Sequence, residues 1–296
     1  MAIGTFLVDN GSTGNTTVHI GGRLRGERIL VPIVSNDPEA IQNRISIAST
    51  IATATDGVLR VVRVETEKED LQRTISPRTN PDELNDVISW ATEQTSKARD
   101  QWHSGILNGR KLEREIRHRV DTNAWDTLVL PAQERNGYVT GHHQRRLYEA
   151  PPCSVLTVNG DAGFGDCASI LVPIANGPHS GLATDVASAL VHQWGAYVDI
   201  LHVVDPDADE SARKAAERRV ETGANRIGQD DRTSTWLLEA VDPAAEIIEQ
   251  SRYYGLTIIG APQSSRLHRF VYGSVSDSVT KEADSAVLSV SAETRP

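Results

Sequence analysis

The sequence predicts an α/β chain of two tandem units, each a doubly wound parallel sheet with helices on both faces. Two observations predict it: repeated strand sequences and the helical patterns between them. Three pairs of short apolar segments repeat along the chain: 28–34 with 169–175, 127–130 with 257–260, and 154–158 with 286–290. Apolar runs without alternation are typical of strands buried on both faces of a parallel sheet. Their recurrence indicates a duplicated unit.

Helical patterns separate these strands in the second unit. Residues 180–194 place apolar side chains at helical spacing, and residues 209–228 are charged and rich in alanine, which predicts a solvent-facing helix. Asp242 before Pro243 predicts an N-cap followed by proline at the first helical position. Right-handed crossovers between the strands then give a doubly wound sheet.

The repeat boundaries predict four segments. They are an N-terminal arm at 1–27, a degenerate first unit at 28–159, a linker at 160–167 and a second unit at 168–293. The linker contains three glycines and two aspartates, a composition typical of a connection without regular structure.

The first unit departs from a clean duplicate. Residues 81–108 read as one long helix, and 111–118 reads as the third strand. Only 119–126 then remain before the strand that begins at residue 127. Because this is too few residues for a full crossover helix, we expect the third helix of this unit to be shortened or lost.

Composition narrows the class of protein. The chain has 296 residues, 39% of them hydrophobic, which is enough for a sizeable core. No apolar run approaches the ~18 residues of a membrane span, and the N-terminus lacks the features of a signal peptide. Only Cys153 and Cys167 are present, which argues against a disulfide framework or a cysteine zinc site. We therefore expect a cytoplasmic protein.

The charge balance is acidic. The formal net charge is −10, and since only five of the 30 cationic residues are lysine, 25 are arginine. This halophilic composition suits a salt-rich cytoplasm, although a GC-rich genome would also favour arginine over lysine. A surface of this charge would repel a phosphate backbone, so no nucleic-acid partner is expected.

A candidate phosphate site follows the fourth strand of the second unit. Ligands bind open parallel sheets beyond the carboxyl ends of the strands. Here Gly260 would let the backbone leave the sheet sharply, and Gly273-Ser274 opens a helix whose N–H groups favour an anion. Arg266 and Arg269 add positive charge in the same loop. The structural alternative makes Gly260 a turn, Ser274 an N-cap and the arginines a solvated loop face.

These features together resemble the universal stress protein family over residues 28–292. The second unit carries ILVPI at 170–174, LHVV at 201–204, a loop of the form Gly260-x2-Gln263-x9-Gly273-Ser274, and a closing strand at 286–290. The resemblance implies Rossmann-like domains of the adenine nucleotide alpha hydrolase-like type. It also implies a stress-response or regulatory protein that binds an adenine nucleotide without catalysis.

The resemblance places ATP or AMP across the second unit, with Mg²⁺ accompanying ATP. The residues that it implies for the adenosine are Pro173, Ile174, Ala175 and Val203. The residues that it implies for the phosphates are Gly260, Gln263, Arg266, Arg269, Gly273, Ser274, Val275 and Ser276.

The chain also departs from the family pattern. Nucleotide binders of the family usually carry Asp at the end of the first strand, where this chain has Ala175 and, in the first unit, Val34. Gln263 replaces the middle glycine of the loop. In the first unit only Gly141 retains a loop glycine, and Glu134 would repel a phosphate. We therefore expect no nucleotide in the first unit.

A ligand-free scaffold or regulatory module is the alternative function, and the resemblance makes a membrane transporter a conceivable partner. The chain contains no Walker A loop, no HExxH and no GxSxG motif, so no catalytic or metal-binding residue is assigned, with weak ATPase activity left open. The closing strands 154–158 and 286–290 are expected to pair within one molecule, and a homodimer of tandem chains is a second arrangement that the resemblance allows.

Overall fold

A computed structural model describes residues 23–25, 28–33, 38–65, 86, 89, 106–108, 125–131, 153–159, 167–261 and 275–293. The first half contains β1 (Arg28–Ile33), α1 (Pro38–Ala54), β2 (Val58–Glu65), β3 (Ile106–Asn108), β4 (Thr127–Pro131) and β5 (Ser154–Asn159). The strands of the second half are β6 (Ser169–Pro173), β7 (Tyr197–Val204), β8 (Thr233–Glu239), β9 (Leu256–Gly260) and β10 (Ala286–Ser291). Its helices are α6 (Pro178–Trp194), α7 (Glu210–Ile227), α8 (Pro243–Ser251) and α9 (Val275–Glu282).

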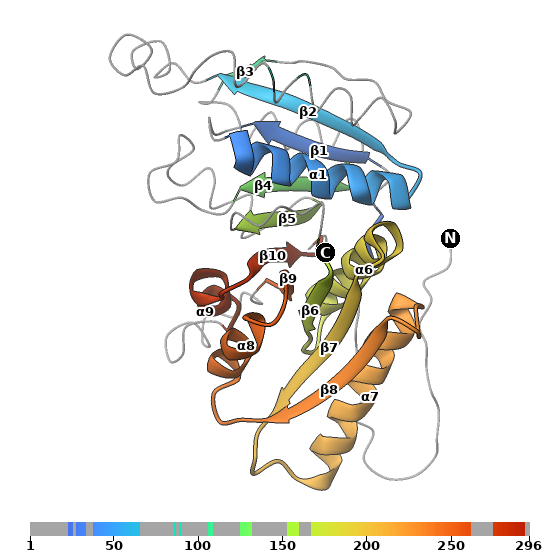
Figure 1. The fold of residues 1–296 in the computed structure, drawn as a ribbon, viewed down its shortest axis with the longest axis vertical. Coiled ribbons are helices and arrows are strands. Elements are labelled where there is room, and N and C mark those ends of the chain that lie inside the picture. The colour runs from blue at the N-terminus through green and yellow to red at the C-terminus, as the bar shows by residue number, and fades with distance from the viewer. Residues whose placement is uncertain are drawn as a thin grey trace.

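The described strands form one sheet in the order β3-β2-β1-β4-β5-β10-β9-β6-β7-β8 (Figure 1). Read inward from either edge, each half has its third, second, first, fourth and fifth strands in that order. This is the strand order of the doubly wound nucleotide-binding fold. Neighbouring strands are parallel within each half, whereas β5 and β10 pair antiparallel. The predicted α/β fold class with two tandem units is confirmed.

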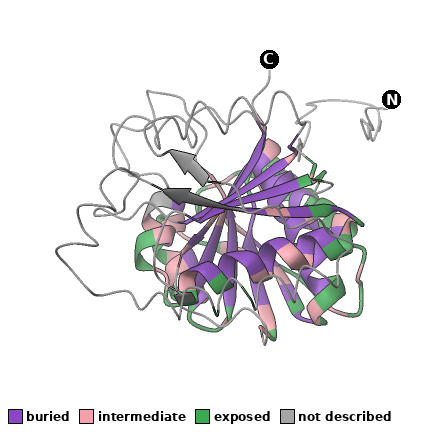
Figure 2. Cartoon of the chain, turned by 90° about the horizontal axis from the view of Figure 1, so that it is seen from above, coloured by how far each residue is buried: buried purple, intermediate pink, exposed green. Residues whose placement is uncertain are grey.

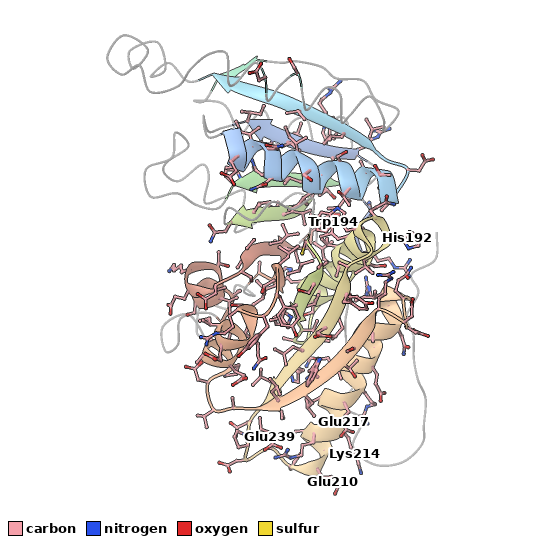
Figure 3. The ribbon with its side chains drawn as sticks, in the orientation of Figure 1. His192, Trp194, Glu210, Lys214, Glu217 and Glu239 are labelled. Atoms are coloured by element: carbon pink, nitrogen blue, oxygen red, sulfur yellow. The ribbon has the colours of Figure 1, made fainter. Side chains whose placement is uncertain are left out.

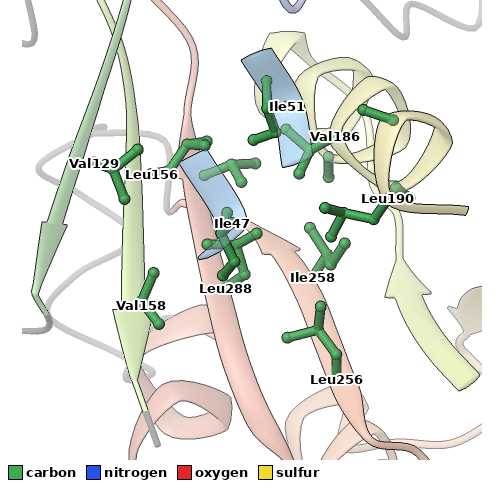
Figure 4. Packing of buried hydrophobic residues seen from close by; sticks show 14 of the residues in the cluster. Ile47, Ile51, Val129, Leu156, Val158, Val186, Leu190, Leu256, Ile258 and Leu288 are labelled. Atoms are coloured by element: carbon green, nitrogen blue, oxygen red, sulfur yellow. The ribbon is translucent and has the colours of Figure 1, made fainter. Parts of the chain in front are cut away.

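The two halves share a hydrophobic core over one face of this sheet. Leu288 of β10 lies opposite Val158 of β5, and both are buried. Above them, Ile47 of α1 and Val186 of α6 belong to the same buried cluster (Figure 4). The sheet and the helices of both halves are therefore packed as one unit across the β5–β10 pair.

The ends of α1 and α6 are joined by a polar contact as well. The indole N–H of Trp194 donates a hydrogen bond to Thr50 Oγ1 at 3.2 Å. Trp194 lies where the C-terminal end of α6 approaches α1 (Figure 3). An indole placed here buries apolar surface and keeps its N–H satisfied.

The opposite face of the second half is covered by α8 and α9. Leu171, Leu201 and Val287 point from the strands into a second cluster that includes Ile247 of α8 and Val279 of α9. Figure 2 shows the strands buried between helices whose outer surfaces are exposed. Alternate residues of the second-half strands thus supply two separate cores, as a doubly wound sheet requires.

The local helix signals of the second half are confirmed. Asp242 Oδ1 accepts hydrogen bonds from the backbone N–H groups of Ala244 and Ala245 at 2.9 and 3.1 Å, and α8 begins at Pro243. The helix α6 ends at Gly195, which adopts a left-handed conformation with φ 68°. A residue with a side chain would be strained at this position.

Two expectations for the first half were wrong. The third strand is Ile106–Asn108, which pairs parallel with the end of β2, so 81–108 is not one continuous helix. The strand contains only two apolar residues, Ile106 and Leu107, and two residues are too few to show a strand periodicity in the sequence. The connection from β3 to β4 therefore begins at residue 109, and it is long enough for a helix, so the reason for expecting a shortened or lost third helix does not hold. Residues 111–118 lie outside the described residues.

Part of the predicted N-terminal arm contacts the second half. Leu24 packs against the shared core, and its backbone N–H donates to Asp185 Oδ2 at 2.8 Å. Asp185 also accepts two hydrogen bonds from Arg226 of α7 at 2.5 and 2.9 Å. One carboxylate on α6 therefore connects the leading segment of the chain to α7. Residues 1–22 and most of the predicted linker, 160–166, lie outside the described residues.

The shared core yields a stability prediction. Leu288 is fully buried at the centre of the sheet, so Leu288→Ala leaves a cavity and should lower the free energy of unfolding by about 3 kcal/mol. Urea denaturation followed by circular dichroism measures this change. Val241→Ala, at a side chain that is 84% exposed, is the matched control and should change stability by less than about 0.5 kcal/mol. Equal effects of the two substitutions would contradict the packing described here.

Candidate functional site

The candidate site lies where the strand order of the second half reverses. β6 pairs parallel with both β7 and β9, so the chain leaves β6 toward one neighbour and leaves β9 toward the other side of the sheet. Crossovers that diverge in this way leave a space at the carboxyl ends of the two strands. The residues that follow β6 and end β9 therefore line the place where a ligand is expected.

The adenosine-side residues lie together at the end of β6. Pro173 and Ile174 are buried, and Ala175 is exposed. The last bond between the neighbouring strands runs from the Ile174 N–H to the Leu201 carbonyl at 2.8 Å, yet β7 continues to Val204. Along a central parallel strand, every second residue bonds the same neighbouring strand. Val203 lies two residues after Leu201, so its backbone groups also point toward the β6 side, beyond the point where β6 ends. The structure brings these predicted residues to one edge.

Gly260 is constrained by helix α6. A Cβ atom at this position would lie 2.9 Å from His179 Cβ and 3.1 Å from the His179 carbonyl carbon. The sequence prediction made Gly260 the point where the backbone turns sharply, but its φ is not in the left-handed region. The glycine is needed because the first turn of α6 packs directly against the end of β9.

Ser180 links the ends of the two strands. Its hydroxyl accepts a hydrogen bond from the Ala175 N–H at 2.9 Å, and its own backbone nitrogen would lie 3.3 Å from a Cβ at Gly260. Ala175, Ser180 and Gly260 thus lie together in one corner of the molecule, at the carboxyl ends of β6 and β9. The Ala175 N–H, which would be one donor for a ligand, is already engaged by the protein.

A buried polar network lies beside this corner. His202 Nδ1 donates to the Ile174 carbonyl at 2.7 Å, which leaves Nε2 as the acceptor for Arg219 Nη1–H at 2.7 Å. Arg219 Nε–H donates to Asn176 Oδ1 at 3.0 Å. Burial lowers the pKa of His202 below its usual range; the hydrogen bond to the Ile174 carbonyl opposes this shift and the Arg219 charge adds to it. His202 is therefore held as the neutral tautomer.

A close approach of α7 makes this network possible. Gly223 lies one turn after Arg219, and a Cβ atom there would lie 3.1 Å from Ile174 Cδ1 and 3.2 Å from Ile200 Cγ2. A side chain at residue 223 would push α7 away from the sheet. The glycine thus keeps Arg219 within reach of His202.

A second histidine, which is buried where His202 is half-buried, lies on α6. His179 Nδ1 accepts a hydrogen bond from the Ala292 N–H at 2.9 Å, directly after β10. Burial lowers the pKa of His179. The same residue packs against Gly260, so the start of α6 is fixed to the ends of β9 and β10.

Only two predicted phosphate-side residues beyond Gly260 fall within the described residues. Val275 begins α9 and is exposed, whereas Ser276 is buried and its carbonyl accepts a hydrogen bond from Thr280 Oγ1 at 2.7 Å. The remaining predicted residues lie outside the described residues: Gln263, Arg266, Arg269, Gly273 and Ser274. The phosphate set therefore stays a prediction.

Sequence reasoning missed Arg219 because α7 was interpreted as a solvent-facing helix. Ala215, Arg219, Gly223 and Ile227 follow one another at four-residue intervals, and all four are buried. The small residues at this spacing were the signal that the helix has an inward face. His202 appeared only as part of the LHVV segment, without a role.

The described residues offer neither a metal site nor a membrane-spanning helix. They contain no group of three or more His, Cys, Asp or Glu side chains placed to hold a metal ion. Within the same residues, no helix combines the length and apolar character that crossing a bilayer requires.

The buried histidines predict how stability depends on pH. Because the folded pKa values of His202 and His179 are lowered, the unfolded chain binds more protons below its histidine pKa of about 6.5. Stability should be fully present above pH 6.5 and fall as the pH drops through the lowered folded pKa values. Thermal unfolding of His202→Gln between pH 7.5 and 5.5 should show a weaker loss than the unchanged protein. Exposed His192→Gln is the control, and equal slopes for both variants would refute the assignment.

The comparisons with known proteins agree with this fold. The sequence model of the universal stress protein family matches residues 168–291. No curated protein sequence matches the chain. Two solved structures from Pseudomonas aeruginosa are similar: a protein of unknown function from strain PAO1, at 17% identity and a TM-score of 0.59, and a putative universal stress protein from strain UCBPP-PA14, at 16% and 0.60. Each match covers 90% of this chain, and 93% and 94% of the other chain.

A third similar structure is the cytoplasmic domain of a prokaryotic cation chloride cotransporter, at 12% identity and a TM-score of 0.56. It is matched over 90% of this chain and 95% of that chain. At these identities the three structures establish the two-unit fold across both halves. The family match itself covers the second half, where the strand ends, α6 and α9 surround the candidate site. Residues 168–291 therefore form a domain that belongs to the universal stress protein family.

Proposed function

We propose that the chain is a stress-response regulatory protein whose second half binds an adenine nucleotide, ATP or AMP, at the carboxyl ends of β6 and β9. The observation that carries the proposal is the open strand edge at Val203, beside exposed Ala175, within the segment that matches the family. Backbone groups at such an edge can pair with the polar edge of a base, as an added strand would.

The described residues fit a nucleoside at this corner. Ala175 is small and exposed, so it leaves room at the end of β6, and Val203 is half-buried at the adjoining strand. The start of α9, at Val275, would face the anionic end of a nucleotide, since helix N-termini attract negative charge. If ATP is the ligand, Mg²⁺ would accompany its phosphates.

We further propose that nucleotide binding serves regulation, without turnover. Among the described residues of the corner, His202 is held neutral by hydrogen bonds at both nitrogens, and His179 is buried with Nδ1 bonded to the backbone. Neither is placed to activate water as a general base.

Nucleotide binding can be tested by calorimetry and thermal shift with ATP, AMP and GTP. We expect ATP or AMP to raise the melting temperature of the unchanged protein, because a ligand that binds only the folded state stabilises it. Gly273→Val, in the predicted phosphate loop, should lose at least tenfold in affinity, the equivalent of about 1.4 kcal/mol.

Gly160→Val makes the same substitution in the predicted linker and serves as the control. It should leave the affinity unchanged. Absence of any shift with ATP and AMP, or equal affinity for the two valine variants, would overturn the proposed phosphate loop.

A ligand-free regulatory module is the second candidate function. Two observations favour it: the Ala175 N–H is already bonded to Ser180, and the two-unit fold is similar to the cytoplasmic domain of a prokaryotic cation chloride cotransporter. We propose, as this alternative, that the folded pair of units contacts a transporter or another protein, as a monomer with paired closing strands or as a homodimer.

Mass spectrometry of the purified and then denatured protein separates the two functions. A co-purified adenine nucleotide is expected under the first, and its absence together with failed titration is expected under the second. Sedimentation equilibrium on the same sample measures whether the chain is a monomer or a dimer.

A further inference from the structure

Within the described residues, Arg219 is a buried cation without a carboxylate partner. Its relative exposure is 8%, and both of its hydrogen bonds within the described part of the chain go to neutral acceptors, Asn176 Oδ1 and His202 Nε2. The neighbouring arginine of the same helix, Arg226, is by contrast paired with Asp185. Burying a charge is costly unless an opposite charge compensates for it.

The uncompensated charge lies on the adenosine side of the candidate site. Asn176 directly follows Ala175, and His202 directly precedes Val203, so Arg219 contacts the neighbours of both residues that are expected to bracket the adenosine. Ala175 and Asn176 are exposed, so solvent and ligands reach this corner. The guanidinium also keeps its Nη2 group without a hydrogen bond to any described residue.

The residue at the end of β6 decides how this charge can be balanced. An acidic side chain there would both neutralise Arg219 and accept hydrogen bonds from ribose hydroxyls. In dinucleotide-binding folds an acidic residue selects the free ribose, whereas a nearby arginine accommodates a ribose phosphate. In those folds the acid follows the second strand, a place that corresponds here to Asp205 after β7. Asp205 Oδ1 accepts a hydrogen bond from the Asp207 N–H, and no bond between Asp205 and Arg219 is present in the described part of the chain. Ala175 supplies no acid either, so the charge of Arg219 stays available for a ribose phosphate, as in the second case.

We propose that the second half recognises an adenine nucleotide that carries a phosphate on the 2′ or 3′ position of its ribose, and that Arg219 binds this phosphate. The inference rests on the nucleotide site proposed above and narrows its ligand class. His202 acts as a positioning residue, since its Nε2 holds one guanidinium nitrogen while its Nδ1–H is fixed to the Ile174 carbonyl. Asn176 would exchange its hydrogen bond with Arg219 for contact with the phosphate.

Calorimetry with four probes tests the ligand class. The probes are 5′-AMP, ADP, adenosine 2′,5′-bisphosphate and adenosine 3′,5′-bisphosphate. ADP has two phosphates, both at the 5′ end, so it controls for the number of phosphates. We expect one of the two bisphosphates to bind about tenfold more tightly than ADP, the size of one charge-assisted hydrogen bond.

Variants assign that preference to the guanidinium. Arg219→Gln should abolish the preference for the bisphosphate over ADP, and Arg219→Lys should retain part of it. Arg218→Gln removes a charge from the exposed side of the same helix and should leave the preference unchanged. Ala175→Asp supplies the missing acid at an exposed position, and should shift the preference from the bisphosphate toward 5′-AMP even if Arg219→Gln fails to fold.

The outcomes separate this inference from the function on which it rests. Binding of 5′-AMP and ADP with no gain for either bisphosphate would overturn the inference and leave the nucleotide site standing. A bisphosphate preference that survives in Arg219→Gln or Ala175→Asp would overturn the role of Arg219. Binding of none of the four probes would overturn both.

Discussion

The antiparallel pair of β5 and β10 is the interaction on which the rest of the structure depends. Each half ends its own sheet with this strand, and the exchange of backbone hydrogen bonds between them removes two open edges at once. Leu288 and Val158 lie opposite each other at this join, and the helices α1 and α6 meet above it. The first half therefore has a structural role that depends on no ligand, because it covers the closing strand of the second half.

Helix α6 transmits this arrangement to the candidate site. Its C-terminal end contacts α1 through Trp194, and its first turn contacts Gly260, Ala175 and Ala292 through His179 and Ser180. The ends of β6, β9 and β10 are consequently held by a single element. The site is thus built on a rigid strand edge and a fixed helix start, and the buried Arg219 network is a second fixed wall beside it.

The sequence predicted the parts of the fold whose signals are local or repeated. The apolar repeats located β1, β6, β5 and β10, and the Asp242-Pro243 pair located the start of α8. It failed at β3, because a strand of three residues leaves no periodicity. It also failed at Arg219 and His202, because their roles arise from contacts between α7 and β7 that a sequence segment does not display. Gly260 was predicted as a sharp turn, whereas the structure requires a glycine there because α6 packs against the end of β9.

The direction of the strands has a consequence for the evolution of the duplicated units. Since β5 and β10 run against each other, the strands of the first half point opposite to those of the second, and the two crossover clefts open at opposite rims of the sheet. The two strand-end edges are therefore built from separate strands, so they are free to diverge while the shared core keeps both copies folded.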